Sequence, residues 1–121
     1  MTTVNYTGSS LFVDNYSYQW TPLTITNADG QPVGFTGSGD RTVQITGIFG
    51  AGGTVVLEGT LDNNPLTLNW FTLKGADGST ALSFTAAGLR TILENCVLVR
   101  PRVSAGDGTT SITAVVIARL A

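Results

Sequence analysis

The fold is decided by residues 41–60, which read RTVQITGIF (41–49), GAGG (50–53) and TVVLEGT (54–60). Both flanking runs alternate apolar with polar or small residues, a period of two that is typical of a β-strand with one buried side. The residues expected on the buried side are Val43, Ile45, Phe49, Val55 and Leu57. Two such runs joined by four glycine-rich residues predict a β-hairpin, with Glu58 directed outward.

Similar short runs follow on both sides of this stretch. They are 23–26, 66–73, 81–84, 96–103 and 111–120, separated by turn clusters that include Asp-Gly pairs at 29–30, 77–78 and 107–108. Seven or eight short strands with frequent turns predict an all-β, single-domain β-sandwich or barrel. The last run has Ile112, Ala114, Val116, Ala118 and Leu120 on one face and Val115 and Ile117 on the other. It is therefore expected to be covered on both sides.

Residues 86–95 are ambiguous between strand and helix. Leu89, Ile92, Leu93 and Cys96 fit the spacing of one helical face. Gly88 opposes a helix, at a cost of about 1 kcal/mol relative to alanine. A strand is favoured, and a single helical turn is the alternative.

Composition excludes several functional classes. The 121 residues include 12% charged side chains, no histidine and one cysteine, and the net charge is −2. The commonest general base and metal ligand are thus missing, and no internal disulfide can form. The six basic residues are scattered, so no nucleic-acid partner is expected. Neither a signal peptide nor a stretch long enough to span a membrane is recognisable, which predicts synthesis in the cytoplasm and no membrane partner.

No group of residues predicts catalysis. Glu58 and Asp62 are paired only by closeness in sequence, and solvated surface charge is the simpler explanation. The loop 50–53 lacks the following helix and Lys-Ser/Thr pair of a phosphate site. Cys96 has no histidine to activate it. We expect no catalytic residue, no metal and no cofactor.

Half of the ten aromatic residues lie in residues 1–22, which show little clean periodicity. The predicted organisation is an irregular aromatic-rich N-terminal arm, or a first strand, at 1–22, followed by the β-sandwich at 23–121. The candidate interface residues in this segment are Tyr6, Phe12, Tyr16, Tyr18 and Trp20. Tyr16, Tyr18 and Trp20 alternate, so as a strand they share one face. Packing in the core or between subunits is favoured over a stacking platform for a sugar.

Arg100-Pro101-Arg102 forms a second candidate interface. Arg100 and Arg102 are expected on the same side of their strand. Proline cannot donate to a strand ladder, which predicts that this strand lies on an edge or ends there. The two guanidiniums could bind carboxylates of another subunit, or could simply keep the edge soluble.

Two segments carry a resemblance to a known family: IFGAGGTVVLEG (48–59) and VRPRVSAGDGTTSIT (99–113). Over about residues 43–121 the chain resembles small virion structural proteins of tailed bacteriophages, of the head decoration or cement type. The resemblance implies a jelly-roll-like β-sandwich on the capsid surface of the virion. It also implies the major capsid protein as partner, a homo-oligomer (trimer or dimer) and no catalytic residue. The alternative is a receptor- or carbohydrate-binding module of a phage tail or head fibre, with Tyr16, Tyr18 and Trp20 as its platform.

Overall fold

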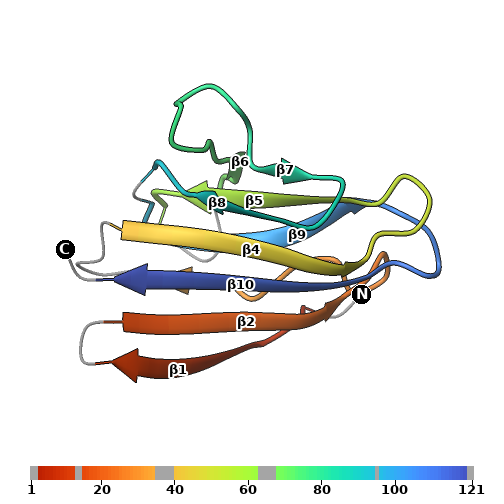
Figure 1. Ribbon diagram of the computed structural model, residues 1–121, viewed down its shortest axis with the longest axis horizontal. Coiled ribbons are helices and arrows are strands. Elements are labelled where there is room, and N and C mark those ends of the chain that lie inside the picture. Colours follow the sequence, from red (N-terminus) through yellow and green to blue (C-terminus); the bar gives the residue numbers. More distant parts are fainter. Residues whose placement is uncertain (1–2, 13–14, 35–39, 63–67, 95, 120–121) are drawn as a thin grey trace.

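The protein consists of β-strands joined by turns and loops (Figure 1). A computed structural model describes residues 3–12, 15–34, 40–62, 68–94 and 96–119, without the side chains of 9–12 and 15. The strands are β1 (Tyr6–Phe12), β2 (Asn15–Leu23), β3 (Val33–Gly34), β4 (Asp40–Ile48), β5 (Thr54–Thr60), β6 (Phe71–Thr72), β7 (Ser83–Phe84), β8 (Gly88–Thr91), β9 (Leu98–Ala105) and β10 (Ser111–Arg119). No helix occurs in these ranges, so the all-β prediction is confirmed.

The strands form two antiparallel sheets. One sheet, here called the β10 sheet, has the order β1-β2-β10-β4-β8. The other, the β5 sheet, has the order β3-β9-β5-β6, and β7 pairs with β5 beside β6. Because each strand presents alternate residues to opposite faces, the two sheets bury one apolar face each against the other.

The core lies between the two sheets and follows the predicted alternation. Buried residues from the β10 sheet include Trp20, Leu23, Val43, Ile45, Ile112, Ala114, Val116 and Ala118, and those from the β5 sheet include Val55, Leu57, Phe84, Val99 and Val103. Each fully buried aliphatic side chain contributes about 1.5–3 kcal/mol by leaving water. The period of two in the sequence therefore predicts these core side chains correctly. It is wrong for Phe49, which follows the end of β4 and is only partly buried against the core.

The predicted hairpin at 41–60 is wrong. β4 pairs with β10 and β8, whereas β5 pairs with β9, β6 and β7, so the loop carries the chain from one sheet to the other. The glycines of the loop serve this crossing: Gly50 has φ +70, and a Cβ on Gly53 would lie 1.8 Å from the Phe49 carbonyl oxygen. Alternation only requires that both strands face the same core, and two strands in opposite sheets meet that requirement as well as a hairpin does.

Asp107 fixes this crossing loop to the loop between β9 and β10. Its Oδ2 accepts a hydrogen bond from the Ala51 N–H at 2.9 Å, and its Oδ1 accepts from the Thr109 N–H at 2.9 Å. The hydrogen bonds from the Thr109 side chain and from these backbone groups lower the pKa of Asp107 to about 2. The Asp-Gly pair at 107–108 thus joins two loops in addition to making a turn.

The N-terminal segment is regular, so of the two alternatives for residues 1–22 the strand is correct and the irregular arm is wrong. Residues 6–12 and 15–23 form β1 and β2, and β2 lies between β1 and β10. The boundary expected after residue 22 falls inside β2. In the ambiguous segment 86–95, Gly88–Thr91 form β8, so the favoured strand is confirmed there.

Two further expectations about strand positions are wrong. β9 is not an edge strand, because β5 lies on one side and β3 on the other. The backbone of Pro101 faces Ala28–Gly30, and its carbonyl accepts the Gly30 N–H at 2.8 Å. Pro101 is tolerated because no N–H is needed from it at this position. β10 is covered on its inner side only, and Ile117 on its other side is 36% exposed.

Candidate interaction surfaces

Trp20 is a core residue and cannot belong to a stacking platform. Its side chain is 0% exposed, and its indole Nε1–H donates to the Gln31 carbonyl at 2.9 Å. The Tyr6 ring packs edge-on against the rings of Tyr18 and Trp20, with centroids 5.3 Å and 6.1 Å apart. The three-ring platform predicted for the carbohydrate-binding alternative is therefore not present.

The remaining aromatic candidates lie progressively nearer the surface along β2. Tyr18 is half-buried, and burial together with the neighbouring tyrosines raises the pKa of its hydroxyl. Tyr16 is 40% exposed. The side chain of Phe12 lies outside the described residues. At the β1–β2 end of the sheet, Tyr6 and Tyr18 are thus partly buried against the core, and Tyr16 is the most exposed of the described aromatic candidates.

Arg100 and Arg102 lie on the same side of β9, as predicted, and both bind Glu58 of β5. The Nε atoms of both arginines lie 3.1 Å from Glu58 Oε1, and Arg100 Nη2 is also 3.1 Å from that oxygen. Asp29 lies 3.7 Å from Arg100 Nη1, and the Trp70 ring centroid is 4.3 Å from Arg100 Cζ. The guanidiniums are thus held by their own chain, on the outer face of the β5 sheet.

The part played by Glu58 and Trp70 was not predicted from the sequence. Glu58 was expected to be a solvated charge, but its side chain is 8% exposed. The signal that could have found it is the register of β5 against β9, which puts Glu58 directly opposite Arg100. Trp70 belongs to the segment before β6 and had no pattern that connected it to β9.

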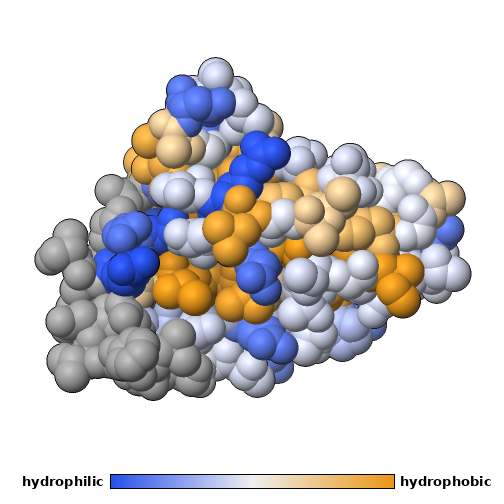
Figure 2. All heavy atoms as spheres, viewed as in Figure 1, coloured by the Kyte–Doolittle hydropathy of each residue, from blue (hydrophilic) through white to orange (hydrophobic). Residues whose placement is uncertain are grey.

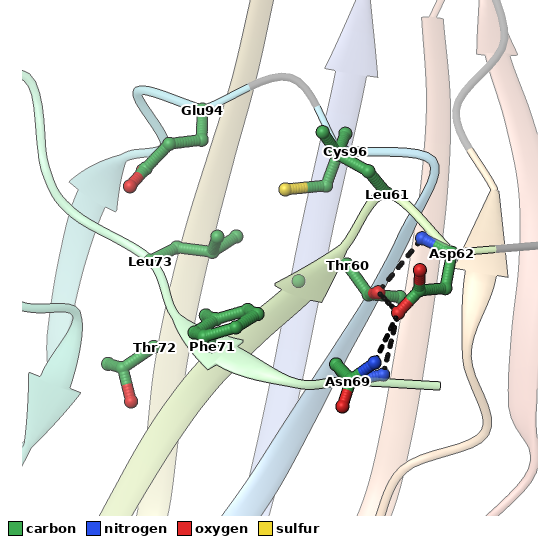
Figure 3. Close-up of a pocket in the computed structure, with 10 residues that line it drawn as sticks. Thr60, Leu61, Asp62, Asn69, Phe71, Thr72, Leu73, Glu94 and Cys96 are labelled. Carbon is green, nitrogen blue, oxygen red and sulfur yellow. Dashed lines mark hydrogen bonds between the residues drawn. The ribbon is translucent and has the colours of Figure 1, made fainter. Parts of the chain in front are cut away.

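A pocket of about 380 Å³ opens at the end of β5 (Figure 3). Apolar side chains form most of its wall, including the Cys96 thiol, and two residues at its rim are largely exposed: Leu61 at 73% and Phe71 at 69%. Asp62, also in the wall, accepts hydrogen bonds from the Asn69 backbone and side chain. Glu94 lines the opposite side and accepts the Lys74 N–H. The pocket is suited to an apolar group, since its carboxylates already have partners.

The thiol in this pocket is expected to react slowly. Burial raises the pKa of the Cys96 thiol, the Glu94 carboxylate raises it further, and the Arg41 guanidinium opposes them. Less thiolate is therefore present at a given pH than in a free cysteine. The rate of reaction with an aromatic disulfide, followed against pH, should rise at a higher pH than for free cysteine. Glu94→Gln should move this profile to lower pH, whereas Asp62→Asn, in the same pocket, should not. An unchanged profile in Glu94→Gln would contradict the assignment.

The outer face of the β10 sheet carries uncharged side chains across its middle. Figure 2 shows it as orange and near-white atoms with a few blue side chains. The pairing register places on it Thr7, Ser17, Gln19, Thr21, Thr42, Gln44, Thr46, Leu89, Thr91, Thr113, Val115 and Ile117. The first charges along β4 and β10 are Asp40 and Arg119, an exposed pair 3.9 Å apart at one end. Across the middle of this face, the outward side chains of β2, β10, β4 and β8 carry no charge.

The described ranges contain no group of three or more Cys, Asp or Glu side chains placed to hold a metal ion. They also contain no helix that is long and apolar enough to cross a membrane.

Comparison with known proteins gives one solved structure of similar fold. No protein-family model and no curated protein matches the chain. The crystal structure of the SPBc2 prophage-derived protein YomS is similar, with a TM-score of 0.59 and 14% sequence identity. The alignment covers 91% of this chain and 98% of YomS. The chain therefore has the fold of a prophage-derived protein over nearly its whole length.

Proposed function

We propose that the protein is a structural virion protein of a bacteriophage, of the head decoration type. In this role it binds the outer surface of the capsid and stabilises contacts between major capsid subunits, as a homo-oligomer and without catalysis. The prophage origin of the similarly folded YomS supports the phage assignment. The observation that carries the docking role is the uncharged outer face of the β10 sheet.

We also assign the fold to the jelly-roll class. Successive strands alternate between the sheets from β2 to β5, and again from β8 to β10. The resulting orders, β2-β10-β4-β8 and β3-β9-β5-β7, interleave early and late strands in both sheets. Eight strands in two such sheets correspond to the jelly roll that viral capsid domains use.

The size of the outer face fits a protein partner. Strands about 4.8 Å apart, with about 3.4 Å per residue, give this five-stranded sheet a flat area of roughly 600 Å². A standard interface buries about 800 Å² per partner, so this face with its rim is large enough. Threonine hydroxyls can hydrogen-bond either to water or to a partner, and no charge has to be stripped of water on docking.

A charge placed in the middle of this face is expected to weaken capsid binding by about tenfold or more. Gln44→Glu keeps the size and shape of the side chain but requires an unpaired carboxylate to lose its water on docking. The measurement is binding of the purified protein to capsids from the phage that encodes it, prepared without this protein. Gln44 is exposed in the isolated chain, so the fold should be unaffected.

The matched control is Ser83→Glu, which adds the same charge at an exposed position on β7, in the other sheet. It should bind like the unmodified protein. Normal binding by Gln44→Glu would reject the docking face. Failure of the unmodified protein to bind capsids at all would reject the function.

A further inference from the structure

β1 is the longest unpaired edge in the described part of the molecule. It pairs with β2 on one side only. On its outer side, residues 29–31 bond to Val4 just before the strand and the Gln31 side chain reaches Tyr6, but no described segment runs along the edge from Thr7 onward (Figure 1). β1 has seven residues, whereas the edge strands β3, β6 and β8 have two, two and four. Very short edge strands are one way in which proteins prevent edge-to-edge pairing, and β1 lacks this protection.

β1 also lacks the chemical protections of an edge. Its sequence, YTGSSLF, contains no charged residue and no proline. By contrast, the edge strand β8 carries Arg90, and Pro32 immediately precedes β3. An uncharged edge of this length is a template for pairing with another strand.

The hydrogen-bonding groups of this edge can be assigned from its first residue. The Tyr6 N–H points to the Gln31 side chain, 3.4 Å from Oε1, and therefore away from β2. In an antiparallel pair, the backbone groups of alternate residues point to the same edge. Gly8 and Ser10 consequently present two N–H and two C=O groups at the free side of β1.

We propose that β1 pairs with β1 of a second copy of the chain, antiparallel, about a two-fold axis at Ser9. In this register Gly8 of each copy exchanges two hydrogen bonds with Ser10 of the other, which gives four bonds and a continuous ten-stranded sheet. An antiparallel edge is its own complement, and β1 carries no charge that would repel its copy. This pairing specifies the interface of the proposed homo-oligomer, and it does not depend on capsid binding.

The neighbouring side chains are compatible with this arrangement. Gly8 lies opposite Tyr18, and a Cβ on Gly8 would be 3.3 Å from the Tyr18 ring. The ring therefore occupies the space above the glycine and shields its backbone on the inner face. The Tyr6 ring, packed edge-on against Tyr18, extends this cover along the strand.

The test is the oligomeric state, measured by sedimentation equilibrium on the full chain. The unmodified protein should be a dimer. Ser10→Pro removes one outward N–H per copy without removing a bond to β2, and it should weaken dimerisation by at least about tenfold. An unchanged thermal unfolding profile at low protein concentration would show that the variant keeps its fold.

Cysteine cross-linking tests the register, in a Cys96→Ser background. Two Ser9 residues would face each other as a non-hydrogen-bonded pair with Cα atoms about 4.5 Å apart, which a disulfide can bridge. Ser9→Cys should therefore form a covalent dimer on oxidation. Thr7→Cys is the matched control: the two Thr7 residues would lie about 14 Å apart along the seam, too far for a disulfide.

Three results would overturn the proposal. A monomer at all accessible concentrations would exclude the second copy as partner of β1. If Ser10→Pro then also lost capsid binding, the edge of β1 would be assigned to pairing with a strand of the capsid protein. A dimer that persists in Ser10→Pro would move the interface elsewhere. Equal cross-linking of Ser9→Cys and Thr7→Cys would exclude the register.

Discussion

Replacement of Trp20 by alanine is expected to destabilise the fold by about 3–5 kcal/mol, the largest effect of any single substitution considered for this protein. Trp20 is fully buried and connects the two sheets. Gly30 lies between its ring and Pro101 of β9, so closely that a Cβ would be 2.9 Å from Trp20 Cδ1 and 2.6 Å from Pro101 Cδ. Alanine would open a cavity there and leave the Gln31 carbonyl without its indole donor.

The measurement is equilibrium unfolding in urea, with Trp20→Phe and Tyr16→Ala as controls. Phenylalanine keeps most of the packing and loses only the hydrogen bond and part of the ring, so its cost should be clearly smaller. Tyr16 lies on the same face of β2 but is 40% exposed, and its removal should cost less than about 1 kcal/mol. Similar losses for Trp20→Ala and Tyr16→Ala would contradict the assignment of Trp20 to the core.

This difference between Trp20 and Tyr16 shows how far the sequence could predict the molecule. The alternation of Tyr16, Tyr18 and Trp20 predicts that they share a face, and they do. It does not predict where along β2 the second sheet covers that face. That limit depends on contacts with Gly30 and Pro101, which lie about ten and eighty residues further along the chain.

The wrong prediction of a hairpin at residues 41–60 has a similar physical cause. Alternation reports which side of a strand faces the core, and β4 buries its predicted side. β5 faces the core with its predicted side too, but its other side, with Glu58, is also buried. Alternation contains no information about the neighbour in the sheet, because a strand in the opposite sheet uses the same core. Short glycine-rich connections favour a hairpin, but here they allow a close crossing between sheets.

The candidate sites also contain features that the sequence predicts and features that depend on the fold. The placement of Arg100 and Arg102 on one side of β9 follows from the period of two alone. Their partner Glu58 depends on the pairing of β5 with β9, and the stacking of Trp70 on Arg100 depends on the segment before β6. The apolar pocket depends on three separate segments that meet at the end of β5, so no local pattern predicts it.

Removal of the Glu58 carboxylate is the second substitution with a large expected effect. Glu58→Gln preserves shape but leaves Arg100 and Arg102 close together without the charge that both of them bind. Loss of one partner from a buried ion pair costs about 3–5 kcal/mol. The lower end is expected here, because the Arg102 side chain is 36% exposed and water screens part of the repulsion.

The matched control is Asp40→Asn, which breaks the exposed ion pair with Arg119, and it should cost less than about 1 kcal/mol. A double-mutant cycle of Glu58→Gln with Arg102→Gln should give a coupling energy well above that of Asp40 with Arg119. Equal coupling for the two pairs would mean that the Glu58 cluster is solvated and does not stabilise the fold.

The cluster also bears on the register of β5 against β9. Glu58 lies directly opposite Arg100 and two residues along from the partner of Arg102, so a slip by one residue would direct the carboxylate into the apolar core. A slip by two residues would keep it outside but change its distance to both guanidiniums. We therefore expect Glu58→Gln to broaden amide resonances of β5 and β9 in NMR spectra more than those of β4 and β10. Uniform changes across both sheets would show that the cluster adds stability without selecting the register.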